Sequence, residues 1–338
     1  MGSTSTLGDP GELLAAIPHL LGFHPTNSLV VLTLTGNPDH TTLDTALRAD
    51  LVPPDEHTNL ATHLVDLLTR QQVDRVILAV ISGPTAGEPP RRELINLVGA
   101  ALAEVNIAVV HALWTAATQR GQPWRCYDEP DCRGTVTDPD TSPVAAAAVL
   151  AGRRTYASRA ALADQLTPDD DQTLARRARL LAAGRTPRLD TDAAQRAATL
   201  VRWAITATAQ GQPPCTDTEI ALLAACLSDP QVSEQCLVFC DGRHAEAAEQ
   251  LWWVLTRATP VPYRAEPAIL LAVSGYLRGD GALAGVALDA AQTAAPGHRM
   301  ASLLRRVIQA GITPQELRAL IAQALSDSHT APSSTDEM

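Results

Sequence analysis

The sequence predicts an α/β domain with a mostly parallel sheet, followed by an all-helical domain built from helical hairpins. Three continuous apolar runs in the first third of the chain are typical of strands that are buried on both faces: 29–34, 75–81 and 107–114. Strand patterns disappear near Pro143, and beyond it apolar residues recur at helical spacing. This change of pattern divides the 338 residues into two domains, the number that the length also suggests.

The predicted α/β domain covers residues 12–155 and follows a polar segment, 1–11, that we expect to be disordered. It opens with an apolar helix that ends at Gly22, which we interpret as the C-cap of that helix. Strands and helices then alternate in the order β-α-β-α-β, at residues 47–52, 58–71, 75–81, 90–104 and 107–114. This alternation predicts parallel strands joined by right-handed crossovers, and residues 124–127 add a strand at an edge.

The predicted helical domain covers residues 156–326, and the polar segment 327–338 is expected to be a disordered tail. Short turns such as Gly279-Asp280-Gly281 separate its helices, and short connections are typical of antiparallel hairpins. Small residues recur between positions 282 and 291, which permits close packing of helices. The pattern is similar to tetratricopeptide arrays, although the repeats are too degenerate to count.

Charge and composition disfavour several classes of function. All 26 basic residues are arginine, so the chain has no lysine for a P-loop, a protein kinase or a pyridoxal-phosphate enzyme. The net charge is −11, and the arginines of residues 176–179 are interpreted as a solvated helix face. Because nucleic acids are bound by basic surfaces, we expect no nucleic-acid partner.

The sequence predicts a cytoplasmic protein that has no membrane contact. No apolar run approaches the ~20 residues that a membrane span needs. The N-terminus has no basic region before its first apolar stretch and so does not resemble a signal peptide. The six cysteines are expected to be reduced thiols in this compartment.

The loop of residues 126–140 is the richest candidate site. It combines cysteines and carboxylates: Cys126, Asp128, Glu129, Asp131, Cys132, Asp138 and Asp140. Clustered carboxylates can bind Mg²⁺ or Ca²⁺, and two cysteines could supply half of a zinc site or form a disulfide. The EF-hand spacing is absent, and no second Cys/His pair lies at a distance typical of a zinc site. We therefore predict an acidic solvated loop with two ordinary thiols, and we expect neither a metal nor a cofactor.

His24, Cys126 and Asp128 are the candidate catalytic residues. His24 lies at the entrance of a predicted strand, and histidine is the commonest acid–base residue near pH 7. The segment 82–87 links a strand to a helix, where parallel sheets bind ligands, but it matches no phosphate-binding pattern. No Gly-x-Ser-x-Gly elbow is present, and structural roles compete at each position. An enzyme would need these three segments to meet at the carboxyl ends of the strands.

Trp252, Trp253 and Tyr276 are the candidate interface residues, and Trp203 is a further tryptophan in a predicted helix. Adjacent tryptophans on one helix point in different directions, so one of Trp252 and Trp253 faces away from the core that holds the other. An exposed tryptophan is a typical interface anchor. Packing in the core is the alternative for each of them.

Three segments of the chain together carry a family resemblance. Residues 12–34 contain a helix followed by Leu-Leu-Gly-Phe-x-Pro-x-x-Ser-Leu-Val-Val-Leu, and the later segments 123–153 and 276–288 carry the same resemblance. The chain resembles an uncharacterised domain-of-unknown-function family of high-GC Gram-positive bacteria over most of residues 12–311. This resemblance implies no reaction and no catalytic residues.

The sequence favours a non-catalytic binding or assembly protein that acts on protein partners through its helical array. Such arrays present extended surfaces to partners, and no complete catalytic constellation is visible in the sequence. The alternative is an enzyme that acts on a small anionic or amide substrate in the α/β domain. The sequence does not indicate an oligomeric state.

Overall fold

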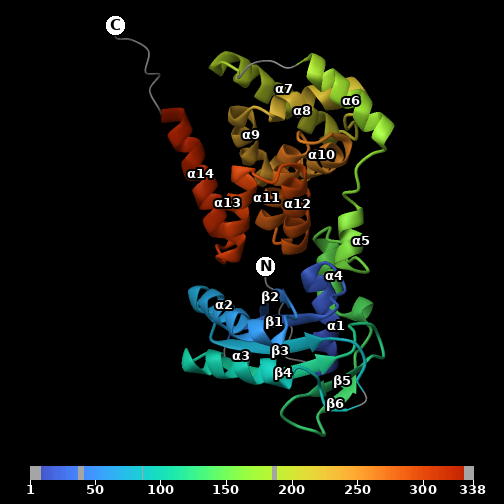
Figure 1. Cartoon of the computed structure of the whole chain (residues 1–338), viewed down its shortest axis with the longest axis vertical. Helices are drawn as coiled ribbons and strands as arrows, with labels where there is room; N and C mark the ends of the chain where they lie inside the picture. The colour runs from blue at the N-terminus through green and yellow to red at the C-terminus, as the bar shows by residue number, and fades with distance from the viewer. Residues whose placement is uncertain (1–8, 37–41, 86, 185–188, 331–338) are drawn as a thin grey trace. The chain divides into compact units, whose positions relative to one another are not determined.

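The computed structural model describes residues 9–36, 42–85, 87–184 and 189–330 (Figure 1). The chain divides into two compact units, residues 1–162 (unit 1) and 163–338 (unit 2). The predicted disordered ends lie partly outside the described residues, but helices reach into both of them. Helix α1 (Pro10–Leu21) begins inside the first segment, because proline is favoured at the first position of a helix, and α14 (Pro314–Thr330) extends into the second.

Unit 1 is built on a six-stranded mixed sheet with the strand order β2-β1-β3-β4-β5-β6. Its strands are β1 (Ser28–Thr35), β2 (Thr42–Asp50), β3 (Arg75–Ile81), β4 (Ala108–Thr115), β5 (Pro123–Cys126) and β6 (Arg133–Thr135). The three predicted strands are confirmed as β1, β3 and β4, and β1 and β3 are buried almost throughout, whereas only the last four residues of β4 are buried. Only β3 and β4 pair in parallel among the described strands, and every other neighbouring pair is antiparallel. The prediction of a mostly parallel sheet is therefore wrong.

The prediction of parallel strands failed first at β1 and β2. The second strand spans residues 42–50, five positions earlier than the predicted 47–52 at its start, and it forms a hairpin with β1. The connection between Thr35 and Thr42 is too short for a crossover, so these two strands must run antiparallel. The segment from β3 through α3 (Arg92–Glu104) to β4 is long enough for a crossover, and it gives the parallel pair.

Both faces of the sheet are covered by helices. On one face, Val31, Leu78 and Val80 pack with α2 (His57–Arg70) and α3, which lie side by side in Figure 1. On the other face, alternate residues of the same strands pack against α1: Val30, Leu32, Ile77, Ala79 and Ile81. This two-sided burial explains why β1 and β3 are continuous apolar runs rather than alternating ones.

Several segments that follow the sheet pack against α1, among them η2 (Pro139–Thr141) and α4 (Pro143–Leu150). Gly22 ends this helix with φ of 80°, which confirms it as the C-cap. The other elements are the short 3₁₀ turn η1 (Pro54–Glu56) and the helix α5 (Arg159–Asp164). Tyr156 returns to α1, because its backbone N–H donates to the Gly22 carbonyl and its carbonyl accepts from the His24 N–H.

Unit 2 is helical throughout its described residues. Its helices are α6 (Asp171–Ala183), α7 (Thr191–Ala209), α8 (Asp217–Leu227), α9 (Pro230–Cys236), α10 (Ala245–Ala258), α11 (Ala265–Leu277), α12 (Gly281–Ala294), α13 (Arg299–Gln309) and α14, with the 3₁₀ turns η3 (Leu237–Cys240) and η4 (Gly242–His244). Helices α11 and α12 form a close hairpin, since a Cβ on Gly275 would lie 3.1 Å from the Cγ of Leu283. No described helix of either unit has the length and apolar character needed to cross a membrane.

Arg177 joins three parts of unit 2 and is only 6% exposed. Its Nε donates to Asp217 at 2.8 Å, and its terminal nitrogen donates to Asp169 at 2.7 Å and to the Ala258 carbonyl at 2.8 Å. These bonds tie α6 to the start of α8 and the end of α10. The interpretation of residues 176–179 as a solvated face is therefore wrong for Arg177, because its charge is compensated by two carboxylates.

Replacing Arg177 with alanine should lower the free energy of unfolding by about 2–4 kcal/mol, because it leaves Asp169 and the Ala258 carbonyl without their donor. Urea unfolding followed by circular dichroism measures the change. Arg176→Ala is the matched control: Arg176 also bonds Asp217 at 2.8 Å, but its side chain is 50% exposed. The control should cost less than about 1 kcal/mol. Equal losses in the two variants would contradict the buried role of Arg177.

Candidate functional site

His19 fastens α1 to the segments that follow the sheet. It is buried in the last turn of α1, with Nδ1 2.9 Å from the Thr155 hydroxyl and Nε2 3.0 Å from the Pro139 carbonyl oxygen. Because a carbonyl oxygen only accepts, Nε2 must carry the proton and donate it. Both ring nitrogens are therefore occupied, and the role of His19 is to position the neighbouring backbone.

His24 lies close to His19, but among the described residues its ring is bonded through one nitrogen only. It is half-buried, and its Nδ1 is 2.8 Å from the hydroxyl of the buried Thr118. Burial and the nearby His19 lower the pKa of His24 below its ordinary 6.5, and Asp140 acts in the opposite direction. No hydrogen bond from the described residues reaches Nε2. A neutral imidazole that is oriented through Nδ1 and open at Nε2 can accept a proton from a bound molecule.

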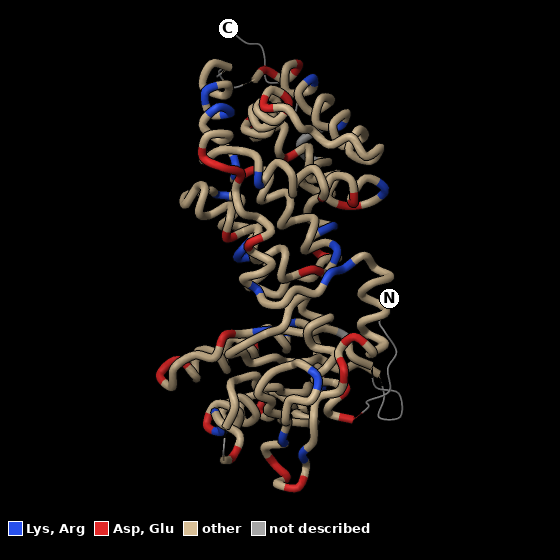
Figure 2. Tube along the Cα trace, turned by 90° about the vertical axis from the view of Figure 1, so that its right-hand side faces the viewer, with Lys and Arg blue, Asp and Glu red and all other residues tan. Residues whose placement is uncertain are grey.

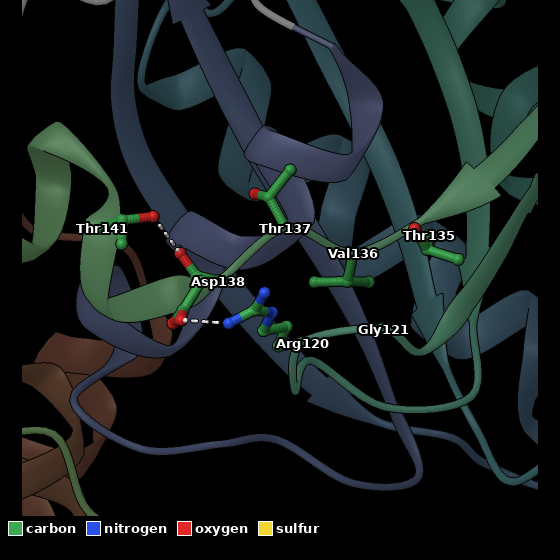
Figure 3. Close-up of a pocket in the computed structure, with 7 residues that line it drawn as sticks. All are labelled: Arg120, Gly121, Thr135, Val136, Thr137, Asp138 and Thr141. Carbon is green, nitrogen blue, oxygen red and sulfur yellow. Dashed lines mark hydrogen bonds and ion pairs between the residues drawn. The ribbon is translucent and has the colours of Figure 1, made fainter.

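A hollow of about 440 Å³ lies beside the turn of residues 118–121 (Figure 3). Its lining residues are Arg120, Gly121, Thr135, Val136, Thr137, Asp138 and Thr141. The Arg120 guanidinium points toward the Asp138 carboxylate at 3.5 Å, and the Thr141 hydroxyl donates to the Asp138 carbonyl at 2.9 Å. Arg120 is two residues beyond Thr118, so the turn that orients His24 also supplies the cation of the hollow. Sequence reasoning missed both residues because the turn carries no recognisable motif.

The three predicted catalytic candidates do not come together. Strand β5 separates them: Thr118 and Arg120 precede its first residue, Pro123, whereas Cys126 ends it and the exposed Asp128 lies beyond. His24 lies near the start of β5, because it is hydrogen-bonded to Thr118. The 82–90 loop meets β5 through a hydrogen bond from Arg125 to the Gly87 carbonyl. No described hydrogen bond or ion pair connects that loop to His24.

Cys126 and Cys132 form a disulfide, so the prediction of two ordinary thiols in this loop is wrong. The reason lies in the β5–β6 hairpin, which pairs Arg125 with Arg133 and brings the next residues together. The Cα atoms of the two cysteines are 5.4 Å apart, and the Cys126 N–H donates to the Cys132 carbonyl at 2.9 Å. The sequence showed the two cysteines but not the hairpin register that joins them.

The other cysteines are free thiols, and three of the four are buried: Cys226, Cys236 and Cys240. Burial raises the pKa of each of these thiols, for Cys240 to about 12, which makes them poor nucleophiles. Among the described residues, no group of three or more His, Cys, Asp or Glu side chains is arranged to hold a metal ion.

The predicted interface residues are not the exposed ones. Trp252 is fully buried in the core of unit 2. Trp253 is partly buried, and its indole lies against the Glu249 carboxylate. The half-buried Tyr276 donates its hydroxyl hydrogen to the Ile312 carbonyl and so secures the turn before α14. Trp203 is the tryptophan that faces outward, with 68% of its surface exposed.

Trp203 lies at the centre of the outer face of α7. Successive helical residues are rotated by about 100°, so Trp203 points about 200° away from the buried Val201 and Ile205. Leu200, 42% exposed, lies one turn earlier on the same face. A shallow, open depression adjoins this turn, and its described lining residues all belong to α7: Asp192, Gln195, Arg196, Thr199 and Leu200.

Charges of both signs are interspersed along each unit (Figure 2). Several arginines are paired with carboxylates, for example Arg278 with Glu249 at 2.9 Å and Arg305 with Asp289 at 2.7 Å. That the protein binds no nucleic acid stays a prediction from its net charge.

His24 should titrate below pH 6.5, and its protonation should destabilise the fold. A lowered pKa means that the folded state binds the proton more weakly than the unfolded chain. The contribution of His24 to stability is therefore present above about pH 6.5 and is lost as the pH falls. Histidine ring signals in NMR spectra measure the pKa directly. Unfolding at pH 7 and pH 5 should show a smaller pH effect in His24→Gln, whereas exposed His63→Gln should behave as the wild type. An unaltered pH effect in His24→Gln would contradict this assignment.

Comparisons with known proteins complete the description of these sites. No match was found among curated proteins or among solved structures. The family described as "Domain of unknown function (DUF4192)" matches residues 10–315, which include α1, the sheet and the helices through α13. The chain therefore belongs to the DUF4192 family.

Proposed function

We propose that the protein is a non-catalytic binding or assembly protein whose helical unit holds a protein partner on the outer face of α7. The observation that carries this proposal is the 68% exposure of Trp203 at the centre of that face. Burying a large apolar side chain contributes roughly 1.5–3 kcal/mol, and tryptophan is enriched among the residues that dominate interfaces. Trp203 has no such burial within the described part of unit 2.

The inner face of α7 holds this surface in a fixed position. Ala194, Val201 and Ile205 are each at most 1% exposed and belong to the core. Arg202 adds a contact beside Trp203, because its guanidinium lies 5.8 Å from the centre of the Phe239 ring. A surface that is already ordered loses little conformational entropy on binding, which favours docking at α7.

Replacing Trp203 with alanine should weaken partner binding at least ~tenfold and leave the unfolding midpoint unchanged, because the indole contributes little to the core. Affinity capture of the full chain from lysate of its native host, with quantitative mass spectrometry, measures the loss. Leu320→Ala is the control, since Leu320 is 50% exposed on α14. Partners retained equally by the wild type and Trp203→Ala would contradict docking at α7.

A second candidate function is supported by one observation in unit 1. The imidazole of His24 is anchored to Thr118 at 2.8 Å and open at Nε2, beside the turn that carries Arg120. In this alternative, unit 1 is an enzyme that acts on a small anionic or amide substrate. Arg120 would bind an anionic group of an amide substrate. Water would add to the amide carbon while the Nε2 atom of His24 takes its proton, and His24 would return that proton to the leaving amine as the C–N bond breaks.

Glutamine and glutamate provide probes of this alternative, because they combine an amide or a second carboxylate with a charged group that Arg120 can bind. Either probe should shift the His24 NMR signals of the wild type at millimolar concentration. His24→Gln should lose the accompanying change in melting temperature, and His63→Gln should retain it. If neither probe shifts the His24 signals, the enzyme alternative loses its support.

A further inference from the structure

We propose that the Cys126–Cys132 disulfide is a reversible redox switch that controls the order of one wall of the hollow in unit 1. The bond links the last residue of β5 to the residue before β6. The wall is the segment 135–138, which continues from the end of β6 and lines the hollow opposite Arg120 (Figure 3). The reductant is a dithiol, either a protein or a small molecule. The proposal depends on neither of the functions proposed above.

The two sulfur atoms are unequally accessible, which gives the exchange reaction a direction. Cys126 is buried at 7% exposure, whereas Cys132 is partly exposed. A thiolate of the reductant therefore attacks Sγ of Cys132, the disulfide bond breaks, and Cys126 leaves as a thiolate that takes up a proton. The second thiol of the reductant then displaces Cys132. The protein gains two electrons and two protons, and the reductant is oxidised to its own disulfide.

The β5–β6 hairpin is short enough to depend on this bond. Strand β5 has four residues and β6 has three, and every residue of β6 is exposed. Strand β6 is also the edge of the described sheet, so it pairs with β5 alone. Isolated hairpins of this size are marginally stable in water, and a disulfide stabilises them by restricting the open chain.

The wall of the hollow is an extension of the same hairpin. The Gly121 N–H donates to the Val136 carbonyl at 2.8 Å, and the Val136 N–H donates to the Gln122 carbonyl at 2.8 Å. These bonds continue the register that pairs Pro123 with Thr135. Opening of the hairpin at the disulfide therefore weakens the next bonds along the ladder, and these are the bonds that hold the wall.

The other end of the wall is anchored without the disulfide. Asp138 precedes η2, and the Pro139 carbonyl accepts a hydrogen bond from the buried His19 of α1 at 3.0 Å. Tyr156 is fastened to the same helix through the Gly22 carbonyl at 2.8 Å. Reduction should therefore loosen the hairpin end of the wall and leave the α1 end in place, which makes the change local and reversible.

Reversible reduction is tested on the full wild-type chain with millimolar dithiothreitol at pH 7, followed by alkylation and mass spectrometry. We expect Cys126 and Cys132 to become alkylated while the buried Cys226, Cys236 and Cys240 stay protected. Removal of the reductant and addition of oxidised glutathione should restore the bond. A bond that resists dithiothreitol in the folded chain, alkylation of the buried cysteines at the same rate, or failure to re-form the bond would each overturn the proposal.

Coupling to the hollow is tested by amide hydrogen exchange in NMR spectra. The Gly121 and Val136 amides should exchange at least ~tenfold faster after reduction, whereas the Tyr156 amide should be unchanged. The double variant Cys126→Ser/Cys132→Ser should exchange fast without reductant and should not respond to it. Cys215→Ser, which removes an exposed free thiol, should respond as the wild type does. Equal protection of Gly121 and Val136 in the oxidised and reduced chains, or an equal loss at Tyr156, refutes the switch.

Discussion

The fold of unit 1 depends on one constraint: β1 and β3 are covered by helices on both faces. Nearly all of their side chains must be apolar, and the two buried polar residues in β1 are bonded locally. Ser28 donates to the Thr26 carbonyl, and Thr33 bonds the backbone of Thr45 across the hairpin. The pairing of β1 with β3 and of β3 with β4 also determines where the candidate site lies. Ser28 pairs with Ile81, and Ile81 with Thr115, so the start of β1 and the end of β4 meet at one end of the sheet. His24 and Thr118 lie just beyond those positions, which is why they can bond.

The apolar runs predicted where the strands lie but not how they pair. A run such as residues 75–81 shows that both faces are buried, and parallel and antiparallel neighbours satisfy that condition equally well. Whether two neighbouring strands run parallel or antiparallel is decided by the length of the connection between them. The short link between Thr35 and Thr42 requires a hairpin, and reading β2 five residues too late hid that link. The helical character of the second half was easier to predict, because helical periodicity is a local property of the chain.

Functional residues were harder to predict because their roles depend on neighbours that are distant in the sequence. Arg177 resembles its neighbour Arg176 in sequence, and both bond Asp217, yet only Arg177 also reaches Asp169 and the Ala258 carbonyl. Trp252 and Trp253 were predicted as interface residues because adjacent residues of a helix point in different directions. In α7 the buried alanine and β-branched residues fix which side of the helix faces the core. Trp203 lies on the opposite side and is therefore exposed. Cys126 and Cys132 became a pair only through the register of β5 with β6. In each case the deciding partner was supplied by tertiary structure.

The unequal environments of the tryptophans make α7 an optical reporter of its own surface. Trp114, Trp124 and Trp252 are at most 5% exposed and Trp253 is partly buried, whereas Trp203 is mostly in contact with water. Collisional quenchers such as acrylamide should therefore reach the fluorescence of Trp203 first. The long-wavelength, quenchable part of the emission comes chiefly from a single known position. Any molecule that covers α7 will shift that component toward shorter wavelength without an added dye.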